Sequence, residues 1–449
     1  MSNQDWLARS RHAVWHPCTQ MKRHETLPIV PIARAEGVWL TDFDGKRYLD
    51  AVSSWWVNLF GHGHPAIKAA IKDQLNTLEH VMLAGFTHRP VIELSERLAG
   101  LTGLGHAFYG SDGASATEIA LKMSFHYWQN CGQSGKTRFL SLENSYHGET
   151  IGALVVTDVP LFSSTYAPLL KTGIRVPTPD ARQAQDGETA EDVARRAARA
   201  LENVLAKQAD SIAALIVEPL VQGAAGMAMY HPAYLEEARR LCDRYQVHLI
   251  ADEIAVGFGR TGTLFACEQA GIRPDFLCLS KGITGGFLPL SCVLTTDSVY
   301  KAFYDDDVTR GFLHSHSYTG NALACRAALA VLDLFEQEDV LAQNRARAAR
   351  FNELLAPLRV HPQVRQFRQQ GMIWAFEVET GRRDFAVAFF SAMLQRGCLV
   401  RPIGNTVYFM PPYVIEDTEM ALLCRATLDT LDELQQAQPE EARPAPPLP

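Results

Sequence analysis

Short apolar runs alternate with helical stretches through the middle of this chain, and this alternation constrains the fold more than any other feature. Runs of about four to eight apolar residues separated by helices are typical of a mostly parallel sheet that is covered on both faces. We therefore expect an α/β domain with a central sheet. The predicted strands are residues 138–142, 213–218, 247–254, 275–279 and 290–295.

The length of the chain predicts a second domain. A chain of 449 residues exceeds the size at which one hydrophobic core keeps growing. We expect residues 61–330 to form a large domain, and residues 1–60 and 331–435 to build a smaller α+β domain from both ends of the chain. Residues 436–449 are rich in proline and poor in apolar residues, so we expect a disordered tail there.

Local patterns within these domains predict individual elements. Apolar and polar residues alternate over residues 36–52 around Asp44-Gly45, a pair that tolerates the backbone of a tight turn, and this predicts a hairpin. Helical spacing appears over residues 65–80, 90–102, the later part of 180–208, and 320–357.

Composition excludes several classes of function. The net charge of −8 gives no attraction to nucleic acid or to an anionic membrane, and no apolar run has the length of a membrane span. Nine cysteines without a CxxC pair indicate neither a disulfide framework nor a zinc site. Residues 1–10 lack the apolar core of a signal peptide. We expect a cytoplasmic protein that acts on small molecules.

Two of the predicted strands end in ionisable residues that suit a cofactor. Asp252 closes the run 247–251 and Lys281 follows the run 276–279, and ligands of open α/β sheets bind beyond such carboxyl ends. Burial lowers the pKa of a lysine and leaves a nucleophilic amine, which can form an imine with an aldehyde. A carboxylate can keep a pyridinium nitrogen protonated. The pair therefore predicts a pyridoxal 5'-phosphate site in which Lys281 holds the cofactor as a Schiff base.

Two further segments fit the same cofactor. The small residues of Gly110–Ala116 run into a predicted helix, and free N–H groups at a helix start can bind a phosphate, although the same pattern also makes a plain helix cap. Tyr146 lies just after the strand 138–142 and offers an aromatic ring that can stack on the cofactor.

Two patterns suggest other chemistry and are weaker. Gly257–Gly262 matches the GxGxxG motif of dinucleotide sites, but its glycines lie several residues beyond the strand and residues 263–267 do not open a convincing helix. His314 and His316 form an HxH pair without an evident third ligand, so we expect no metal.

The chain resembles the class-III, or omega-type, aminotransferases of pyridoxal-phosphate fold type I, from about residue 11 to 435. The family's segments stand in its order here: Ala251-Asp252-Glu253, Gly257–Gly262, Pro274-Asp275, Ser280-Lys281-Gly282 and Thr319-Gly320-Asn321. Within the family, the likeness is greatest to members that aminate 8-amino-7-oxononanoate in biotin biosynthesis. The marks of that group are Trp15-His16-Pro17, Ser53–Trp56, Tyr230-His231-Pro232, Arg401-Pro402 and Tyr408–Tyr413.

The resemblance implies a fold, a reaction and a set of site residues. It implies a ping-pong transamination with S-adenosylmethionine as amino donor and Lys281 as catalytic residue, and it implies that Asp252 faces the pyridine nitrogen. It implies a homodimer with shared active sites, because two of the phosphate contacts would come from the neighbouring subunit. The implied phosphate contacts are Gly113 and Ala114, with His316 and Ser317 from the neighbour; the implied substrate contacts are Trp55, Tyr146, Lys281, Ser315 and Arg401, with Arg260 near the site.

Three positions depart from the family's pattern. Cys18 stands where a tyrosine is frequent, and a thiol cannot stack or reach as a phenol does, so the substrate pocket there is open to question. His316 replaces a frequent proline, and Ser317 replaces a threonine while keeping the hydroxyl.

Several alternatives stay open at this level. The residues do not decide between S-adenosylmethionine and lysine as amino donor. Other omega-aminotransferases, acting on ornithine, 4-aminobutyrate or a diamine, share the cofactor residues. A dehydrogenase using Gly257–Gly262 and a non-catalytic protein of the same fold are further alternatives, and the presence of both Lys281 and Asp252 argues against the latter.

Overall fold

The structure of the chain, a computed structural model, describes residues 1–171 and 173–436. It divides into two compact units. The large unit comprises Ala66–Leu341, and the small unit combines Met1–Pro65 with the described residues from Ala342 onward. From residue 437 on, the predicted tail lies outside the described residues. Among the helices of the described residues, none is long and apolar enough to cross a membrane.

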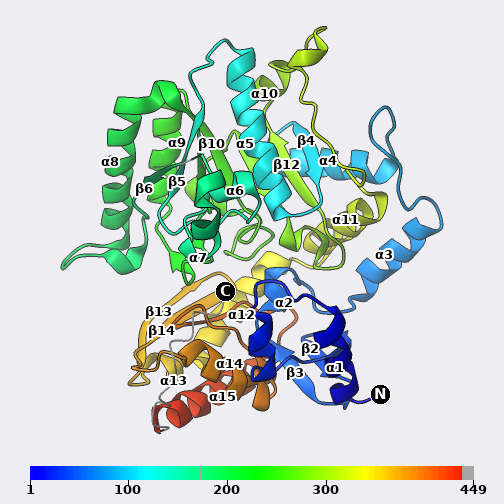
Figure 1. Ribbon diagram of the computed structural model, residues 1–449, viewed down its shortest axis with the longest axis vertical. Coiled ribbons are helices and arrows are strands. Elements are labelled where there is room, and N and C mark those ends of the chain that lie inside the picture. Colours follow the sequence, from blue (N-terminus) through cyan, green and yellow to red (C-terminus); the bar gives the residue numbers. More distant parts are fainter. Residues whose placement is uncertain (172, 437–449) are drawn as a thin grey trace. The chain divides into compact units, whose positions relative to one another are not determined.

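A seven-stranded sheet forms the centre of the large unit (Figure 1). Strand β12 runs antiparallel to both of its neighbours, β11 and β4, and all other adjacent pairs are parallel. The prediction of a mostly parallel sheet is therefore confirmed. In spatial order the strands are β4 (His106–Gly110), β12 (Ser291–Thr295), β11 (Phe276–Leu279), β10 (His248–Asp252), β7 (Ile212–Val217), β5 (Arg138–Leu142) and β6 (Ile174–Val176).

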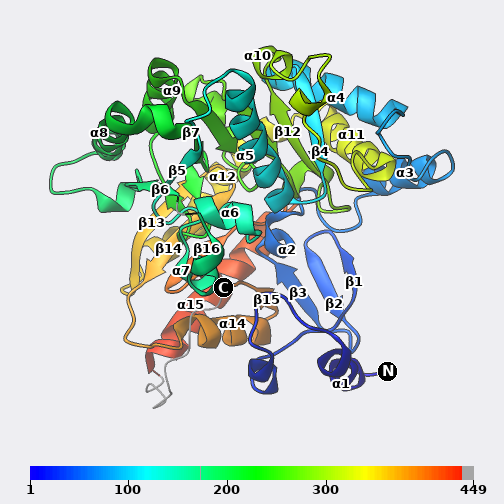
Figure 2. The same cartoon turned by 45° about the horizontal axis from the view of Figure 1, so that its top comes forward.

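Both faces of this sheet are covered. On strand β7, Ala214 and Ile216 belong to the apolar core that includes Ile119 of helix α5 (Gly113–Asn130). Because side chains alternate along a strand, the intervening Leu215 points to the opposite face, and it is buried as well. Helix α5 lies along one face of the sheet in both Figure 1 and Figure 2. Burial on both faces explains why the strands are continuous apolar runs in the sequence.

Two further helices of the large unit begin at side-chain caps. Helix α4 follows His88, whose side chain accepts the Val91 N–H, and helix α8 opens with a capping box at Thr189. The remaining elements are α3 (Pro65–Leu75), α4 (Arg89–Thr102), α6 (Ile151–Val156), α7 (Pro160–Ser163), α8 (Ala190–Gln208), α9 (Ala233–Tyr245), α10 (Asp297–Lys301), α11 (Ala322–Gln337), and the strands β8 (Val221–Gln222) and β9 (Ala228–Met229).

The single helix predicted over residues 320–357 was wrong. Helix α11 ends at Gln337 and helix α12 (Val340–Leu354) begins after a break. Asp339 in this break has φ 45°, a left-handed conformation that a right-handed helix cannot contain. The break lies next to the boundary between the large unit and the small unit at residue 341.

The small unit contains two small sheets. In the first, β1 (Ile32–Glu36), β2 (Trp39–Asp42) and β3 (Arg47–Asp50) are antiparallel, and β15 (Cys398–Leu399) adds in parallel to β3. The predicted hairpin is confirmed, with Gly45 at φ 90° in its turn. The other elements are β13 (Val364–Gln370), β14 (Ile373–Val378), β16 (Thr406–Phe409), α1 (Asn3–Ala13), α2 (Ser53–Trp56), α13 (Ala356–Arg359), α14 (Phe385–Gln395) and α15 (Asp417–Gln436).

Candidate active site

Ionisable side chains gather at one edge of the large sheet. Asp252 is the last residue of β10, Glu218 directly follows β7, and Lys281 follows β11 after Ser280. These three strands are parallel and adjacent, so their carboxyl ends meet at the same edge. Strand β4 runs in the same direction, because β12 is antiparallel to both β4 and β11, and helix α5 therefore starts at this edge too.

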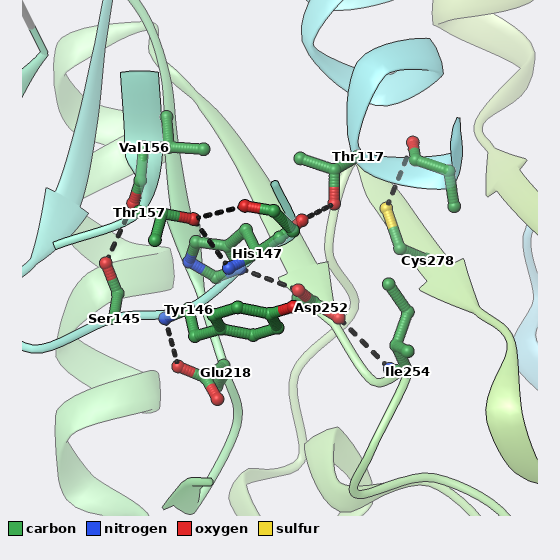
Figure 3. A network of polar contacts seen from close by, with 12 residues as sticks. Thr117, Ser145, Tyr146, His147, Val156, Thr157, Glu218, Asp252, Ile254 and Cys278 are labelled. Atoms are coloured by element: carbon green, nitrogen blue, oxygen red, sulfur yellow. Dashed lines mark hydrogen bonds and ion pairs between the residues drawn. The ribbon is translucent and has the colours of Figure 1, made fainter. Parts of the chain in front are cut away.

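A buried hydrogen bond joins Asp252 to His147 (Figure 3). His147 Nδ1 lies 2.6 Å from Asp252 Oδ2, and the two side chains are 0% and 5% exposed. An ionised carboxylate can only accept, so Nδ1 carries the proton in this pair. The His147 N–H donates to Thr157 Oγ1 at 3.0 Å, and the Thr117 hydroxyl donates to the His147 carbonyl at 2.8 Å. The histidine backbone is held at both ends, and the imidazole in turn orients the carboxylate.

The Lys281 amine has a lowered pKa, which favours its action as a nucleophile. This pKa lies below the usual lysine value because burial disfavours the charged form, while the carboxylates of Asp252 and Glu218 oppose this shift. The lysine has φ 31°, an uncommon backbone conformation that follows directly on a buried strand. An amine that loses its proton more readily attacks an aldehyde more readily.

The start of helix α5 offers an anion site. Asp112 caps the helix by accepting the Ser115 N–H at 2.9 Å. Within the described residues, no hydrogen bond engages the N–H groups of Gly113 and Ala114, which point along the positive end of the helix dipole. A Cβ at Gly113 would lie 3.1 Å from Ile254 Cγ2, so glycine lets the loop after β10 approach the helix start.

Glu218 is a member of this edge that sequence reasoning did not single out. Its carboxylate accepts the Tyr146 N–H and the Gly223 N–H, both at 3.0 Å. The pKa of Glu218 is raised to about 7, chiefly by burial; His147 opposes the shift and the charge of Asp252 adds to it. The only signal in the sequence was its position directly after an apolar run, which it shares with many ordinary strand ends.

The raised pKa of Glu218 predicts a pH-dependent stability. The folded chain holds a proton up to about pH 7 that the unfolded chain releases near its ordinary value of 4.5. Stability should therefore fall as pH rises through this window and become level above it. Glu218→Gln removes the ionisation, so the variant should not show the loss of about 3 kcal/mol that wild type shows between pH 4 and pH 8. The amide nitrogen cannot accept one of the two N–H bonds, and that cost is the same at every pH.

Denaturant unfolding of the two proteins at pH 4, 6 and 8 measures this effect. The exposed Glu236→Gln on helix α9 is the control and should not alter the pH profile. A Glu218→Gln variant that loses as much stability between pH 4 and pH 8 as wild type would show that Glu218 does not titrate in this range.

Tyr146 lies beside this group, directly before His147. Its hydroxyl donates to Glu149 Oε1 at 2.9 Å, and its ring makes an edge contact with Phe162, with centroids 5.7 Å apart. The ring is half-buried, and its backbone is tied to Glu218. In Figure 3 the Tyr146 ring is drawn beside Asp252 and His147.

The other predicted residues of the large unit are less closely grouped. His316 Nε2 lies 3.3 Å from Ser111 Oγ, immediately before the cap of helix α5, and the Ser317 carbonyl faces His80 Nε2 at 2.6 Å. Ser315, directly before His316, is exposed. His314 Nδ1 lies 2.8 Å from Lys122 Nζ. Arg260 is 1% exposed in the loop after β10.

This loop does not have the structure of a dinucleotide site. The segment Gly257–Gly262 is followed by a short 3-10 helix, Ala266–Ala270, and not by an α-helix. Dinucleotide sites need the glycine motif to open a helix whose N-terminus faces the pyrophosphate.

In the small unit, Trp55, Arg401 and Cys18 form a separate group. The Arg401 guanidinium lies over the Trp55 ring, 5.1 Å from its centroid, and the indole is 42% exposed. Burial lowers the pKa of Arg401, and Tyr408 and Cys18 counter that shift. Cys18 is half-buried with φ 49°. An arginine stacked on an indole offers both a cation and an apolar face to a ligand.

The turn that carries Trp55 is left-handed. Residues Ser53, Ser54, Trp55 and Trp56 have φ of 51°, 46°, 72° and 73°, so α2 is a left-handed turn built without glycine. Each such residue costs ~1–2 kcal/mol, so the turn persists only because its surroundings hold it. The sequence carries no signal for this conformation.

The large unit fits pyridoxal phosphate. A phosphate, a pyridinium nitrogen and an aldehyde require an anion site, a carboxylate and a nucleophilic amine. The N–H groups at the start of α5, Asp252 and Lys281 supply these three at one sheet edge. The buried Nε2 of His147 has no hydrogen-bond partner in the described part of the chain, as expected of a site lined for a further group.

Comparison with known proteins places the chain in a family. The model of the aminotransferase class-III family matches residues 20–431. The chain belongs to the class-III aminotransferases, which are pyridoxal-phosphate enzymes of fold type I. This confirms the resemblance, the cofactor and the fold class predicted from the sequence.

Individual relatives and solved structures match over nearly the whole chain. An adenosylmethionine-8-amino-7-oxononanoate aminotransferase of Helicobacter pylori is 47% identical over 429 residues, which cover 94% of this chain and 96% of that protein. The crystal structure of the enzyme of the same name from Methanocaldococcus jannaschii matches with a TM-score of 0.89 and 35% identity, covering 96% of this chain and 99% of the other. A PLP-bound amine transaminase from an uncultivated Pseudomonas species matches with a TM-score of 0.88 and 33% identity over 94% and 98% of the two chains.

Proposed function

We propose that this enzyme transfers the amino group of S-adenosylmethionine to 8-amino-7-oxononanoate, giving 7,8-diaminononanoate in biotin biosynthesis. The observation that carries the proposal is the match over nearly the whole chain to relatives named for this reaction, of which one is 47% identical. The sheet edge of the large unit supplies the groups that any aminotransferase needs.

The residues of that edge have distinct roles in the proposal. Pyridoxal phosphate, when bound, acts as an electron sink and carries the amino group between donor and acceptor. Lys281 would hold the cofactor through its amine and would take and return the proton at the substrate carbon. Asp252 keeps the ring nitrogen protonated, and His147 fixes the orientation of Asp252. Gly113 and Ala114 would bind the phosphate through their N–H groups, and the Tyr146 ring would stack on the cofactor.

The proposal assigns the far end of the keto acid to the small unit. This substrate has a long apolar chain that ends in a carboxylate, which requires an apolar surface and a cation. Trp55 and Arg401 offer both in one stacked pair. The planar guanidinium can bind a carboxylate through two parallel hydrogen bonds. Ser315, Cys18 and Arg260 remain proposed contacts of the substrate pocket.

Arg401→Ala should weaken binding of the keto acid. Loss of a buried partner for a carboxylate costs ~2–4 kcal/mol, which corresponds to a KM raised by about 30-fold or more. Steady-state kinetics with varied 8-amino-7-oxononanoate measure the effect. Arg365→Ala is the matched control, because Arg365 is an exposed arginine of the small unit paired with Glu379. An unchanged KM for Arg401→Ala would show that another residue binds the substrate carboxylate.

A half-reaction followed by absorbance tests the proposed donor. Purified holoenzyme is mixed separately with S-adenosylmethionine, lysine, ornithine and 4-aminobutyrate, and conversion to the pyridoxamine form is recorded. We expect conversion with S-adenosylmethionine, followed by formation of 7,8-diaminononanoate when the keto acid is added. Conversion by lysine and not by S-adenosylmethionine would show that lysine is the amino donor. Conversion only by ornithine or 4-aminobutyrate would contradict the assignment to biotin biosynthesis.

We further propose a homodimer in which His316 and Ser317 complete the phosphate site of the neighbouring subunit. Support comes from two segments of the large unit, residues 80–86 and 313–318, which carry exposed apolar side chains. The segments are adjacent, since His80 contacts both Ser317 and the Tyr318 ring. Large apolar patches on a soluble protein usually mark an interface. Sedimentation equilibrium should give twice the chain mass of 49.8 kDa, and a monomer with full activity would contradict the proposal. The exposed apolar residues of the two segments are Met82, Phe86, Leu313 and Tyr318.

A further inference from the structure

A buried carboxylate holds the left-handed turn and has no part in the chemistry proposed above. Asp50 ends strand β3 and is fully buried. Its Oδ1 accepts the Ser54 N–H at 2.9 Å and the Val52 N–H at 3.3 Å. Its Oδ2 accepts the Ser54 hydroxyl at 2.7 Å and faces His62 Nε2 at 3.0 Å. Four polar contacts thus satisfy a group that would be costly to bury alone.

His62 is itself fixed in place, so it can act as a support. Its N–H donates to the Gly37 carbonyl at 2.7 Å, and the Gly37 N–H donates back at 3.0 Å. Gly61, directly before it, has φ 81°, and a Cβ there would lie 2.7 Å from Val414 Cγ2. The backbone around His62 therefore has little room to shift, and the imidazole holds the Asp50 carboxylate from a rigid position.

The turn has other anchors at its two ends. The Ser53 hydroxyl donates to the Met410 carbonyl at 2.8 Å, and Trp56 Nε1 donates to the Tyr408 hydroxyl at 3.1 Å. Between them, Ser54 bonds to Asp50 through both its N–H and its hydroxyl. The backbone at Ser54 and Trp55 is therefore the part of the turn that depends on this carboxylate.

The position of Trp55 follows from that backbone. Ser54 and Trp55 have φ/ψ of 46°/51° and 72°/47°, and these angles direct the indole to the Arg401 guanidinium. Without the two bonds from Ser54 to Asp50, the backbone can return to the ordinary right-handed or extended regions, which L-residues prefer. The indole would then leave the guanidinium, and the stacked pair would be lost.

We infer that Asp50, supported by His62, is a positioning residue that locks the left-handed turn and thereby sets the Trp55–Arg401 pair for the carboxylate end of the substrate. The inference rests on the proposed function, because it deepens the role assigned there to Trp55 and Arg401. Loss of the Asp50 carboxylate should therefore weaken substrate binding by displacing Trp55, without slowing the chemical step.

Asp50→Asn tests this with little change in shape. The amide nitrogen cannot accept hydrogen bonds, so one of the two oxygen positions no longer serves Ser54 and His62. In the holoenzyme, we expect KM for 8-amino-7-oxononanoate to rise about tenfold while kcat stays within about twofold. Asp44→Asn is the matched control, as an exposed aspartate of the same hairpin, and should leave both constants unchanged.

A double-mutant cycle separates positioning from a general structural role. In a Trp55→Ala background, Asp50→Asn should raise KM by less than about twofold, because its effect acts through the missing indole. An equal rise in both backgrounds would overturn the inference, as would an unchanged KM in a folded Asp50→Asn enzyme. If Asp50→Asn fails to fold, Ser54→Ala takes its place, with a rise of about threefold that Trp55→Ala must suppress.

The order of measurements keeps the two proposals apart. Wild-type turnover of the keto acid is measured first, and its absence would contradict the proposed function and with it the substrate assigned to the pair. If wild type is active, an equal rise in KM in both backgrounds of the double-mutant cycle contradicts only the role of Asp50.

Discussion

Replacing Lys281 by alanine should lower kcat by ~10⁴-fold or more, because one amine both holds the cofactor and moves the proton at the substrate carbon. The amine has a lowered pKa and follows β11 at the sheet edge that carries Asp252. Single- and multiple-turnover assays of purified protein measure the loss. Appreciable multiple-turnover activity in Lys281→Ala would contradict the assigned role.

Stability separates lost chemistry from lost folding in this variant. Because burial lowers the Lys281 pKa, the unfolded chain binds this proton more strongly than the folded chain does below pH 10.5. Folding therefore carries a penalty at neutral pH, which alanine removes. The Lys281→Ala apoenzyme should be at least as stable as the wild-type apoenzyme at pH 8. Lys301→Ala, an exposed lysine of helix α10, is the control and should retain full activity.

Asp252→Asn should have the second largest effect, a loss of about 10²–10³ in kcat/KM. The amide keeps the shape of the side chain but supplies no negative charge to a pyridinium nitrogen, and loss of a buried charge partner costs ~2–5 kcal/mol. The same change gives the His147 Nδ1–H a weaker acceptor than the carboxylate oxygen that lies 2.6 Å away in wild type. Asp186→Asn, in an exposed loop of the large unit, is the matched control.

Kinetics and cofactor affinity of the Asp252→Asn holoenzyme measure this prediction. We expect weaker cofactor binding and a slow half-reaction, with thermal stability of the apoenzyme close to that of wild type. An Asp252→Asn enzyme with wild-type kcat would show that another group protonates the ring nitrogen.

The positions predicted best from the sequence are those that depend on a local pattern. Asp252 and Lys281 each follow an apolar run, and parallel strands bring such ends to one edge wherever the sheet places them. The start of helix α5 was found in the same way, from small residues before a helical pattern. The hairpin at Asp44-Gly45 depends on a turn pair that acts within four residues.

Features that depend on distant residues were not predicted. His147 meets Asp252 across 105 positions of sequence, and only the order of the strands brings them together. The left-handed turn at Ser53–Trp56 opposes the preference of its own residues and is imposed by Asp50 and by Met410, far along the chain. The break at Asp339 likewise lies within a stretch of good helix formers. The local propensities of these residues do not depend on distant contacts, so they could not predict these features.

Reduction of the holoenzyme with borohydride, followed by peptide mass mapping, identifies the lysine that holds the cofactor. Borohydride joins the cofactor permanently to the lysine that holds it, so the modified peptide identifies that lysine without any assumption about the substrate. We expect loss of the yellow absorbance and a single modified residue, Lys281. Modification at another lysine, or a protein that binds no pyridoxal phosphate, would contradict it.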